Sequence, residues 1–142
     1  MLEPLSGYLW LGAKLLLNEQ GPFPLSGEAY NFGPAADVNN NVAEVVDALA
    51  PYWPGFASEM DRAGQAGMKE CTLLKLCCDK SLAYLGWQAT LNFAETIRFT
   101  AEWYRAFYAP QGDARPDMYA FTMNQIAEYS GKAAAKGLAW AK

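Results

Sequence analysis

A helical spacing of apolar residues recurs along this chain of 142 residues, and it constrains the fold more than any other feature of the sequence. Near the start of the chain, six small or apolar side chains recur with the i, i+3, i+4 spacing of a helix face: Leu5, Tyr8, Leu9, Gly12, Ala13 and Leu16. Residues at these intervals lie on one face of an α-helix. The spacing therefore predicts a helix over residues 5–17.

Capping and stop signals predict the next two helices. Asn41 and Glu44 have the spacing of a capping box, in which each side chain accepts a hydrogen bond from the backbone N–H of the other residue. A proline inside a helix removes a hydrogen bond, so we expect Pro51 to end this one. Residues 79–85 are predicted to form a short helix capped by its own first residue. Gly86 suits the left-handed conformation that follows a helix end.

Two further helices are predicted toward the C-terminus. Asn92 and Glu95 repeat the capping spacing before the helix that we expect to be the longest. Thr122 and Gln125 have the spacing of another capping box, which predicts that the last helix begins there. Gly131 is expected to end that helix, because glycine is enriched just beyond helix C-termini.

Strand signals are sparse in this sequence. Residues 29–34 and the apolar run 73–76 have strand character, and the first is stopped by Gly-Pro. Two strands alone form a marginal sheet, so they would have to pack on helices or join a larger sheet. We therefore predict a mainly helical α/β domain over residues 1–130 with few short strands. Residues 131–142 are rich in alanine and lysine and are predicted to form a frayed tail.

The absence of histidine excludes several classes of site. The chain has no histidine general base and no Ser-His-Asp or Cys-His catalytic site. We also expect no metal site, because most zinc sites use histidine or paired cysteines, and Cys71, Cys77 and Cys78 are expected to be reduced thiols. The net charge of −4 argues against nucleic acid as a partner. No apolar run approaches the roughly 20 residues of a membrane helix and no signal peptide is recognised, so we expect no membrane partner and a cytoplasmic location.

No motif for catalysis or cofactor binding is found in the sequence. Gly64 and Gly67 have part of the spacing of a dinucleotide-binding loop, but the third glycine is replaced by Glu70. Tyr129 and Lys132 are three residues apart, whereas the Tyr-x-x-x-Lys pair, in which lysine lowers the pKa of a catalytic tyrosine, needs four. We therefore predict no catalytic residue and no cofactor-binding residue in this chain.

Several segments, in order along the chain, resemble the CDP-glucose 4,6-dehydratases, which are extended short-chain dehydrogenase/reductases. The more specific segments are L-E-P-L-S-G-Y-L at residues 2–9 and D-M…Q-I…Y at residues 117–129. Between them, matching segments are G-E-A-Y-N-F-G-P (27–34), L-K-L (74–76), L-G-W (85–87) and W-Y (103–104). The resemblance covers the chain from residue 1 to about residue 130.

The resemblance implies the C-terminal, substrate-binding part of such an enzyme, without the dinucleotide-binding Rossmann half. The family removes water from a CDP-hexose with a bound NAD. Its NAD loop and its Tyr-x-x-x-Lys pair lie in the half that precedes the matching part. NAD is therefore a cofactor of the full-length family, and we expect none in this chain. The resemblance leaves enzymatic activity open and favours a nucleotide-sugar-binding part that is inactive alone.

The resemblance also indicates a ligand and partners. Glu3, Lys69 and Glu70 are the candidate substrate-binding residues for a CDP-sugar. Lys69 stands where the family tends to have histidine and keeps a donor for a phosphate. The surface that packs on the dinucleotide-binding half in the family would be apolar and exposed here, and such patches seek partners. The alternative function is therefore a stand-alone module that forms a homo-oligomer through this face or binds a nucleotide sugar.

Overall fold

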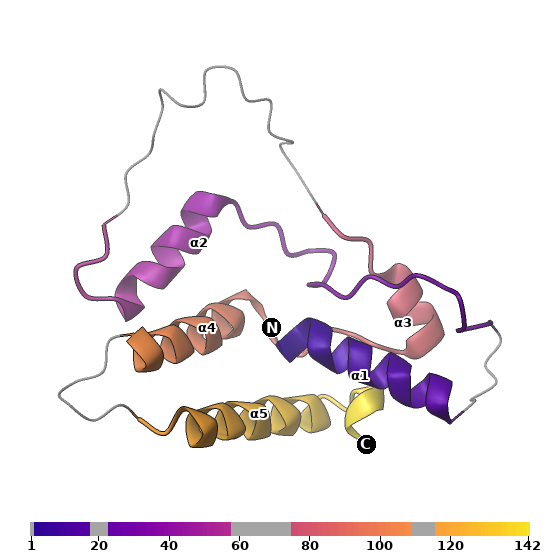
Figure 1. Cartoon of the computed structure of the whole chain (residues 1–142). Coiled ribbons are helices and arrows are strands. Elements are labelled where there is room, and N and C mark those ends of the chain that lie inside the picture. Colours follow the sequence, from indigo (N-terminus) through magenta and orange to yellow (C-terminus); the bar gives the residue numbers. More distant parts are fainter. Residues whose placement is uncertain (1, 18–22, 58–74, 109–115) are drawn as a thin grey trace.

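The structure, a computed structural model, describes residues 2–17, 23–57, 75–108 and 116–142. The regular elements in these ranges are α1 (Leu2–Leu16), α2 (Val42–Leu49), η1 (Ala50–Tyr52), α3 (Asp79–Leu85), α4 (Phe93–Tyr108), α5 (Met118–Ala135) and η2 (Ala139–Ala141). Figure 1 shows α4 and α5 side by side with α2 against α4, while α1 and α3 lie at the other end of the molecule. No helix of the described ranges has both the length and the apolar character that crossing a bilayer needs.

The two predicted strands do not form in the described residues, so the fold is mainly helical. Residues 29–33 form no regular secondary structure; of the run 73–76, the first two residues lie outside the described ranges and the last two form none. Hydrogen bonds that involve side chains, and not a ladder of backbone hydrogen bonds, connect the first segment to residues 77–81. The Asn31 side-chain amide donates to the Cys77 carbonyl at 3.1 Å, and the Ser81 hydroxyl donates to the Asn31 carbonyl.

Two of the three predicted capping boxes, those before α2 and α4, are confirmed. At the start of α2, Asn41 Oδ1 accepts from the Glu44 N–H at 3.0 Å, and the Glu44 carboxylate accepts from the Asn41 N–H at 2.9 Å. Asn92 and Glu95 make the same two bonds before α4, at 2.9 and 3.0 Å. Gly86 follows α3 with a φ of 63°, a left-handed conformation that favours glycine.

The predicted start of the last helix is wrong. α5 begins four residues earlier than Thr122, because the Asp117 side chain accepts hydrogen bonds from two N–H groups of the first turn. Thr122 and Gln125 face α4 instead of capping a helix. Thr122 Oγ1 accepts from Trp103 Nε1 at 3.0 Å, and Gln125 donates to the Phe99 carbonyl at 2.9 Å. With 18 residues, α5 is also longer than α4, which has 16.

The frayed tail predicted for residues 131–142 is also wrong. α5 continues beyond Gly131, and Ala133 inside this segment is fully buried. The Trp140 ring of η2 stacks on the Tyr129 ring with centroids 5.5 Å apart and planes at 20°. A glycine inside a helix costs about 1 kcal/mol relative to alanine. Burial of these C-terminal side chains, together with the helix propensity of the alanines that follow, outweighs the cost of Gly131 inside the helix.

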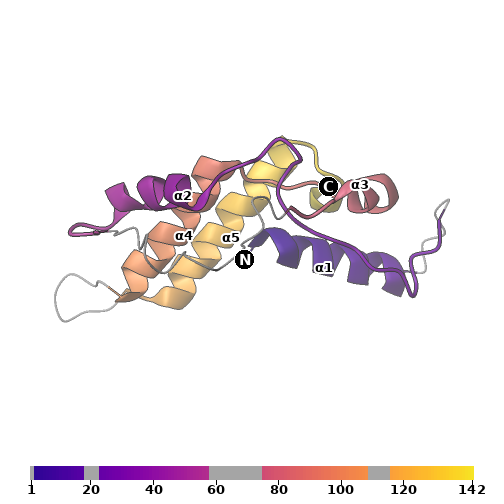
Figure 2. The same cartoon turned by 90° about the horizontal axis from the view of Figure 1, so that it is seen from above.

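The core is small and aromatic. Phe32, Leu85 and Trp87 form its buried centre, and the Phe32 and Trp87 rings meet edge to face with centroids 5.0 Å apart. α1 is attached to this core by one face. Trp87 Nε1 donates to Ser6 Oγ at 3.0 Å, and Gly7 lies directly against the Phe32 ring. Figure 2 shows that α1 runs away from the α4–α5 pair from there.

Ion pairs join α4 to α5. Lys132 Nζ of α5 lies 2.7 Å from Glu95 Oε1 of α4, and Arg98 of α4 pairs with Glu128 of α5 and, within α4, with Glu102 at 3.0 Å. The hydrogen bond from Lys132 holds the pKa of Glu95 below its ordinary value, and the hydrogen bond from the capped backbone N–H adds to this effect. The Glu95 carboxylate is therefore favoured in its charged form when the chain is folded.

We expect Glu95→Gln to make stability less dependent on acid pH. A carboxyl whose pKa is lowered by folding contributes stability that is complete above its unfolded pKa and is lost as the pH falls through the folded pKa. The free energy of unfolding of the wild type should therefore fall more steeply than that of the variant between about pH 5 and pH 3. Urea denaturation at several pH values measures this.

Glu44→Gln is the matched control for this prediction. It makes the same change in the capping box of α2, where the carboxylate accepts from Asn40 and Asn41 instead of from a lysine. Glutamine can fill the same position in a capping box, so both variants keep the cap. The control keeps the pair between Lys132 and Glu95, so its slope should stay steeper than that of Glu95→Gln, and equal slopes for the two variants would contradict the role given to Lys132.

Candidate functional site

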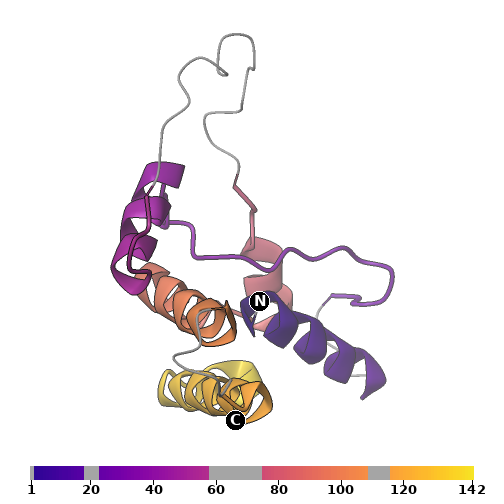
Figure 3. The ribbon, with the colours of Figure 1, turned by 60° about the vertical axis from the view of Figure 1, so that its left-hand side comes forward.

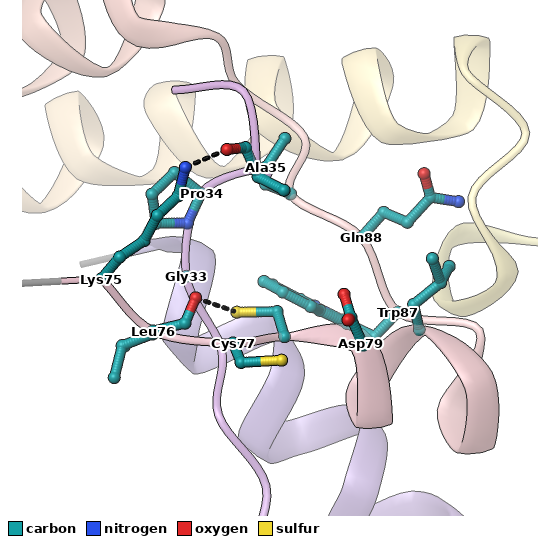
Figure 4. A pocket seen from close by; sticks show the side chains of 13 residues that line it. Gly33, Pro34, Ala35, Lys75, Leu76, Cys77, Asp79, Trp87 and Gln88 are labelled. Carbon is teal, nitrogen blue, oxygen red and sulfur yellow. Dashed lines mark hydrogen bonds between the residues drawn. The ribbon is translucent and has the colours of Figure 1, made fainter. Parts of the chain in front are cut away.

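A pocket of about 460 Å³ opens between segments that are far apart in the sequence, as Figure 4 shows. One wall is made by residues 33–36 and the other by residues 75–79, which lead into α3. Leu82 of α3 and residues 87–89 complete the lining. Pockets of about 300–1,000 Å³ are the usual size for small-molecule ligands, so this pocket is the candidate functional site.

The two walls approach each other closely at Gly33. A Cβ placed at this glycine would lie 3.4 Å from Cys78 Sγ and 3.4 Å from a methyl carbon of Leu76, which leaves little room for a side chain. The same walls are tied together by the bond from the Asn31 side chain to the Cys77 carbonyl. The shape of the pocket therefore depends on contacts between residues more than 40 positions apart in the sequence.

Lys75 supplies the positive charge of the pocket. Its ammonium donates to Asn39 Oδ1 at 3.1 Å and to the Ala36 carbonyl, and both acceptors are neutral oxygen atoms. These two bonds orient the ammonium without cancelling its charge. Gln88 also lines the pocket, in the segment that follows α3, and its amide end points away from Lys75 (Figure 4). A cation and an amide among mostly apolar lining residues suit a ligand that has both an anionic and a flat apolar part.

Two thiols and a carboxyl also line the pocket. Cys77 is exposed and Cys78 is half-buried, and neither forms a disulfide. Burial raises the pKa of the Cys78 thiol above its ordinary value, so this group carries its proton at neutral pH and is a weak nucleophile. Asp79 is the first residue of α3 and not its cap as predicted; the cap is Cys78, without a side-chain bond. In the described ranges, no three His, Cys, Asp or Glu side chains gather to hold a metal ion.

Glu3, a predicted substrate-binding residue, is not among the residues that line the pocket. Its carboxylate accepts hydrogen bonds from the N–H groups of Thr90 at 3.0 Å and Leu91 at 2.6 Å. The Tyr129 hydroxyl lies 2.9 Å from Glu3 Oε2 and 2.9 Å from Ser6 Oγ. The carboxylate thus connects α1 to α5 and to the segment before α4. A role of Glu3 in substrate binding stays a prediction.

Tyr129 is a hydrogen-bond donor in this cluster and not a base. Burial raises the pKa of its hydroxyl to about 12, so the group keeps its proton at neutral pH. Lys132, which follows three residues later, is paired with Glu95 of α4. The two residues therefore serve the contact between helices rather than a Tyr-Lys catalytic arrangement.

The other predicted substrate-binding residues, Lys69 and Glu70, lie outside the described residues. The structure instead assembles Lys75 and Gln88 at the pocket, and sequence reasoning had not selected either as a site residue. One signal was available for Lys75, because it is the single charged residue in the apolar run 73–76.

No protein-family model, no curated protein and no solved structure matches this chain. The dehydratase resemblance therefore stays an expectation that rests on the short segments described above.

Proposed function

We propose that this chain is the C-terminal, nucleotide-sugar-binding part of a CDP-glucose 4,6-dehydratase-like protein and that it is inactive alone. The observation that carries the proposal is the pocket of about 460 Å³, in which Lys75 is the cationic residue and most other lining residues are apolar. A CDP-sugar combines an anionic diphosphate with a flat base and a polar sugar. Each of these parts has a matching group in the pocket.

In this proposal the Lys75 ammonium binds the diphosphate. An ammonium has three donors, and the two neutral oxygens that it now meets, on Ala36 and Asn39, leave its charge available to an anion. The Gln88 amide would hydrogen-bond to the polar edge of the base. The Asp79 carboxylate would accept hydrogen bonds from sugar hydroxyls, and its negative charge would keep the diphosphate toward the lysine.

The chemistry of the family reaction explains why the chain by itself would be inactive. The family moves a hydride with NAD, so turnover needs a site that holds a nicotinamide and a base that accepts a proton from the sugar. In the family both belong to the portion that precedes the matching part. We therefore propose that this chain acts together with an NAD-binding portion, within one longer chain or as a separate subunit.

Calorimetric titration with CDP-glucose and with CDP tests the binding site. We expect both ligands to bind the wild type, and we expect Lys75→Met to weaken binding about tenfold or more, because a charge-assisted bond to the diphosphate is lost. Lys80→Met is the matched control, since Lys80 pairs with Glu28 and does not line the pocket. Its affinity should equal that of the wild type. No heat at millimolar ligand, or equal affinities for all three proteins, would contradict the assignment.

An activity assay tests the second half of the proposal. The purified chain, incubated with CDP-glucose and NAD, should release no 4-keto-6-deoxy sugar. Turnover by the chain alone would show that the catalytic groups are present and would reject the proposed dependence on another portion. Because binding and turnover are measured separately, a failure of one leaves the other interpretable.

A further inference from the structure

The outer face of α1 carries an apolar stripe that the described structure leaves largely exposed, although the Tyr8 ring at its side meets the Phe32 ring edge to face with centroids 5.4 Å apart. The α1 stripe consists of Leu5, Tyr8, Leu9, Gly12, Leu15 and Leu16. These residues repeat at helical intervals and span about a third of the helix circumference. The exposed fractions are 74% for Leu9, 86% for Leu16 and 59% for Tyr8. An amphipathic helix normally turns such a face toward a core, so this orientation is unusual for a helix of an isolated domain.

The opposite face of α1 is held firmly against the rest of the chain, so the stripe cannot simply rotate inward. Trp10 Nε1 donates to the Leu85 carbonyl at 2.8 Å, and Ser6 Oγ accepts from Trp87 Nε1 at 3.0 Å. Gly7 lies against the Phe32 ring with no room for a Cβ. Turning the stripe inward would break all these contacts. Figure 3 shows α1 at the edge of the molecule, with no other helix on its outer side.

We infer that two copies of this chain pair through the α1 stripe. The exposed fractions of its five large side chains correspond to on the order of 600 Å² of apolar surface per copy. A symmetric pair would therefore bury about 1,200 Å², which reaches the lower end of the range for stable protein interfaces. None of the six stripe residues is charged, so a second copy of the same surface meets no like-charge repulsion.

The stripe is also complementary to itself in shape. Gly12 lies near its middle, and a Cβ built there would meet nothing within 4 Å, so the helix surface is open at this point. In an antiparallel pair about a two-fold axis near residues 10 and 11, Leu9 of one copy lies over Gly12 of the other, and Leu5 lies beside Leu16. Such a pair is closed because both copies use the same surface. Antiparallel helix dipoles add a small favourable contribution.

Sedimentation velocity over about a hundredfold range of protein concentration tests this pairing with the full chain. The wild type should shift from one to two times the chain mass, with a dissociation constant on the order of micromolar given the modest area. Leu9→Glu should remain monomeric throughout, because it places two carboxylates against the partner helix. Leu9 is largely exposed, so this change leaves the fold intact, which far-UV circular dichroism checks.

Val42→Glu is the matched control for this experiment. Val42 is 79% exposed at the start of α2, outside the α1 stripe, and the variant should pair like the wild type. A wild type that stays monomeric, a Leu9→Glu variant that still pairs, or growth beyond two copies would each overturn the inference. The pairing does not depend on the ligand of the pocket. Titration of CDP-glucose into the Leu9→Glu variant therefore reports the proposed function independently.

Discussion

Trp87→Ala is expected to lower the free energy of unfolding by about 3–5 kcal/mol, the usual cost of removing a buried tryptophan ring. Trp87 is 1% exposed and meets Phe32 edge to face at the centre of the core. It also donates a hydrogen bond to Ser6 of α1. Because domains of this size have a total stability of about 5–15 kcal/mol, the variant should be largely unfolded at modest urea concentrations. Urea denaturation followed by circular dichroism measures the loss.

Trp87→Phe is the control that separates the ring from its hydrogen bond. Phenylalanine keeps an aromatic ring against Phe32 but cannot donate to Ser6, so the variant leaves a smaller cavity and one buried hydroxyl with fewer partners. We expect a cost clearly below that of Trp87→Ala, about 1–3 kcal/mol. If Trp87→Ala cost less than about 1 kcal/mol, the core would not be centred on this residue.

Gly7→Ala and Gly12→Ala are expected to change stability in opposite directions although both lie in α1. A Cβ at Gly7 would come closer than 3.0 Å to three carbons of the Phe32 ring, so the alanine must push the ring or the helix away at a cost of about 1–3 kcal/mol. A Cβ at Gly12 meets nothing within 4 Å. There alanine should stabilise the helix by about 0.5–1 kcal/mol, because glycine loses more backbone entropy on folding.

Both glycine variants are best compared in the Leu9→Glu background, which removes the proposed pairing through α1. The free energy of unfolding in urea is compared for three proteins: the Leu9→Glu variant alone, that variant with Gly7→Ala, and that variant with Gly12→Ala. Equal stabilisation by both alanines would show that α1 does not rest on Phe32. The exposed orientation of the α1 stripe would then lose its structural basis.

Helices whose signals are local were predicted well from the sequence. The capping boxes of α2 and α4 need only residues three apart, as at Asn92 and Glu95, and the structure forms both of their hydrogen bonds. Gly86 likewise follows α3 in the conformation that favours glycine. The same reasoning failed at Thr122, where the capping pattern occurs inside a helix. There the Thr122 hydroxyl accepts a hydrogen bond from Trp103 of α4 instead of capping a helix.

The candidate site could be predicted only in small part. Lys75 lies in an apolar run that the sequence predicts as a strand, but its hydrogen-bond partners Ala36 and Asn39 come from a distant segment of the chain. Glu3 was selected as a substrate-binding residue, and the structure places it in a hydrogen-bond cluster with Tyr129, 126 residues away. Such distances carry no local pattern, so residue spacing alone does not reveal them.

The positions of several helix ends and the helical spacing of α1 were readable from the sequence, because they depend on hydrogen bonds and side-chain intervals within four residues. Which face of α1 is buried was decided by the tertiary structure. Ser6 and Gly7 turn inward because Trp87 and Phe32, distant along the chain, offer a hydrogen bond and a close-packed ring on that side. The more apolar stripe, with Leu9 and Leu16, is left outside for the same reason.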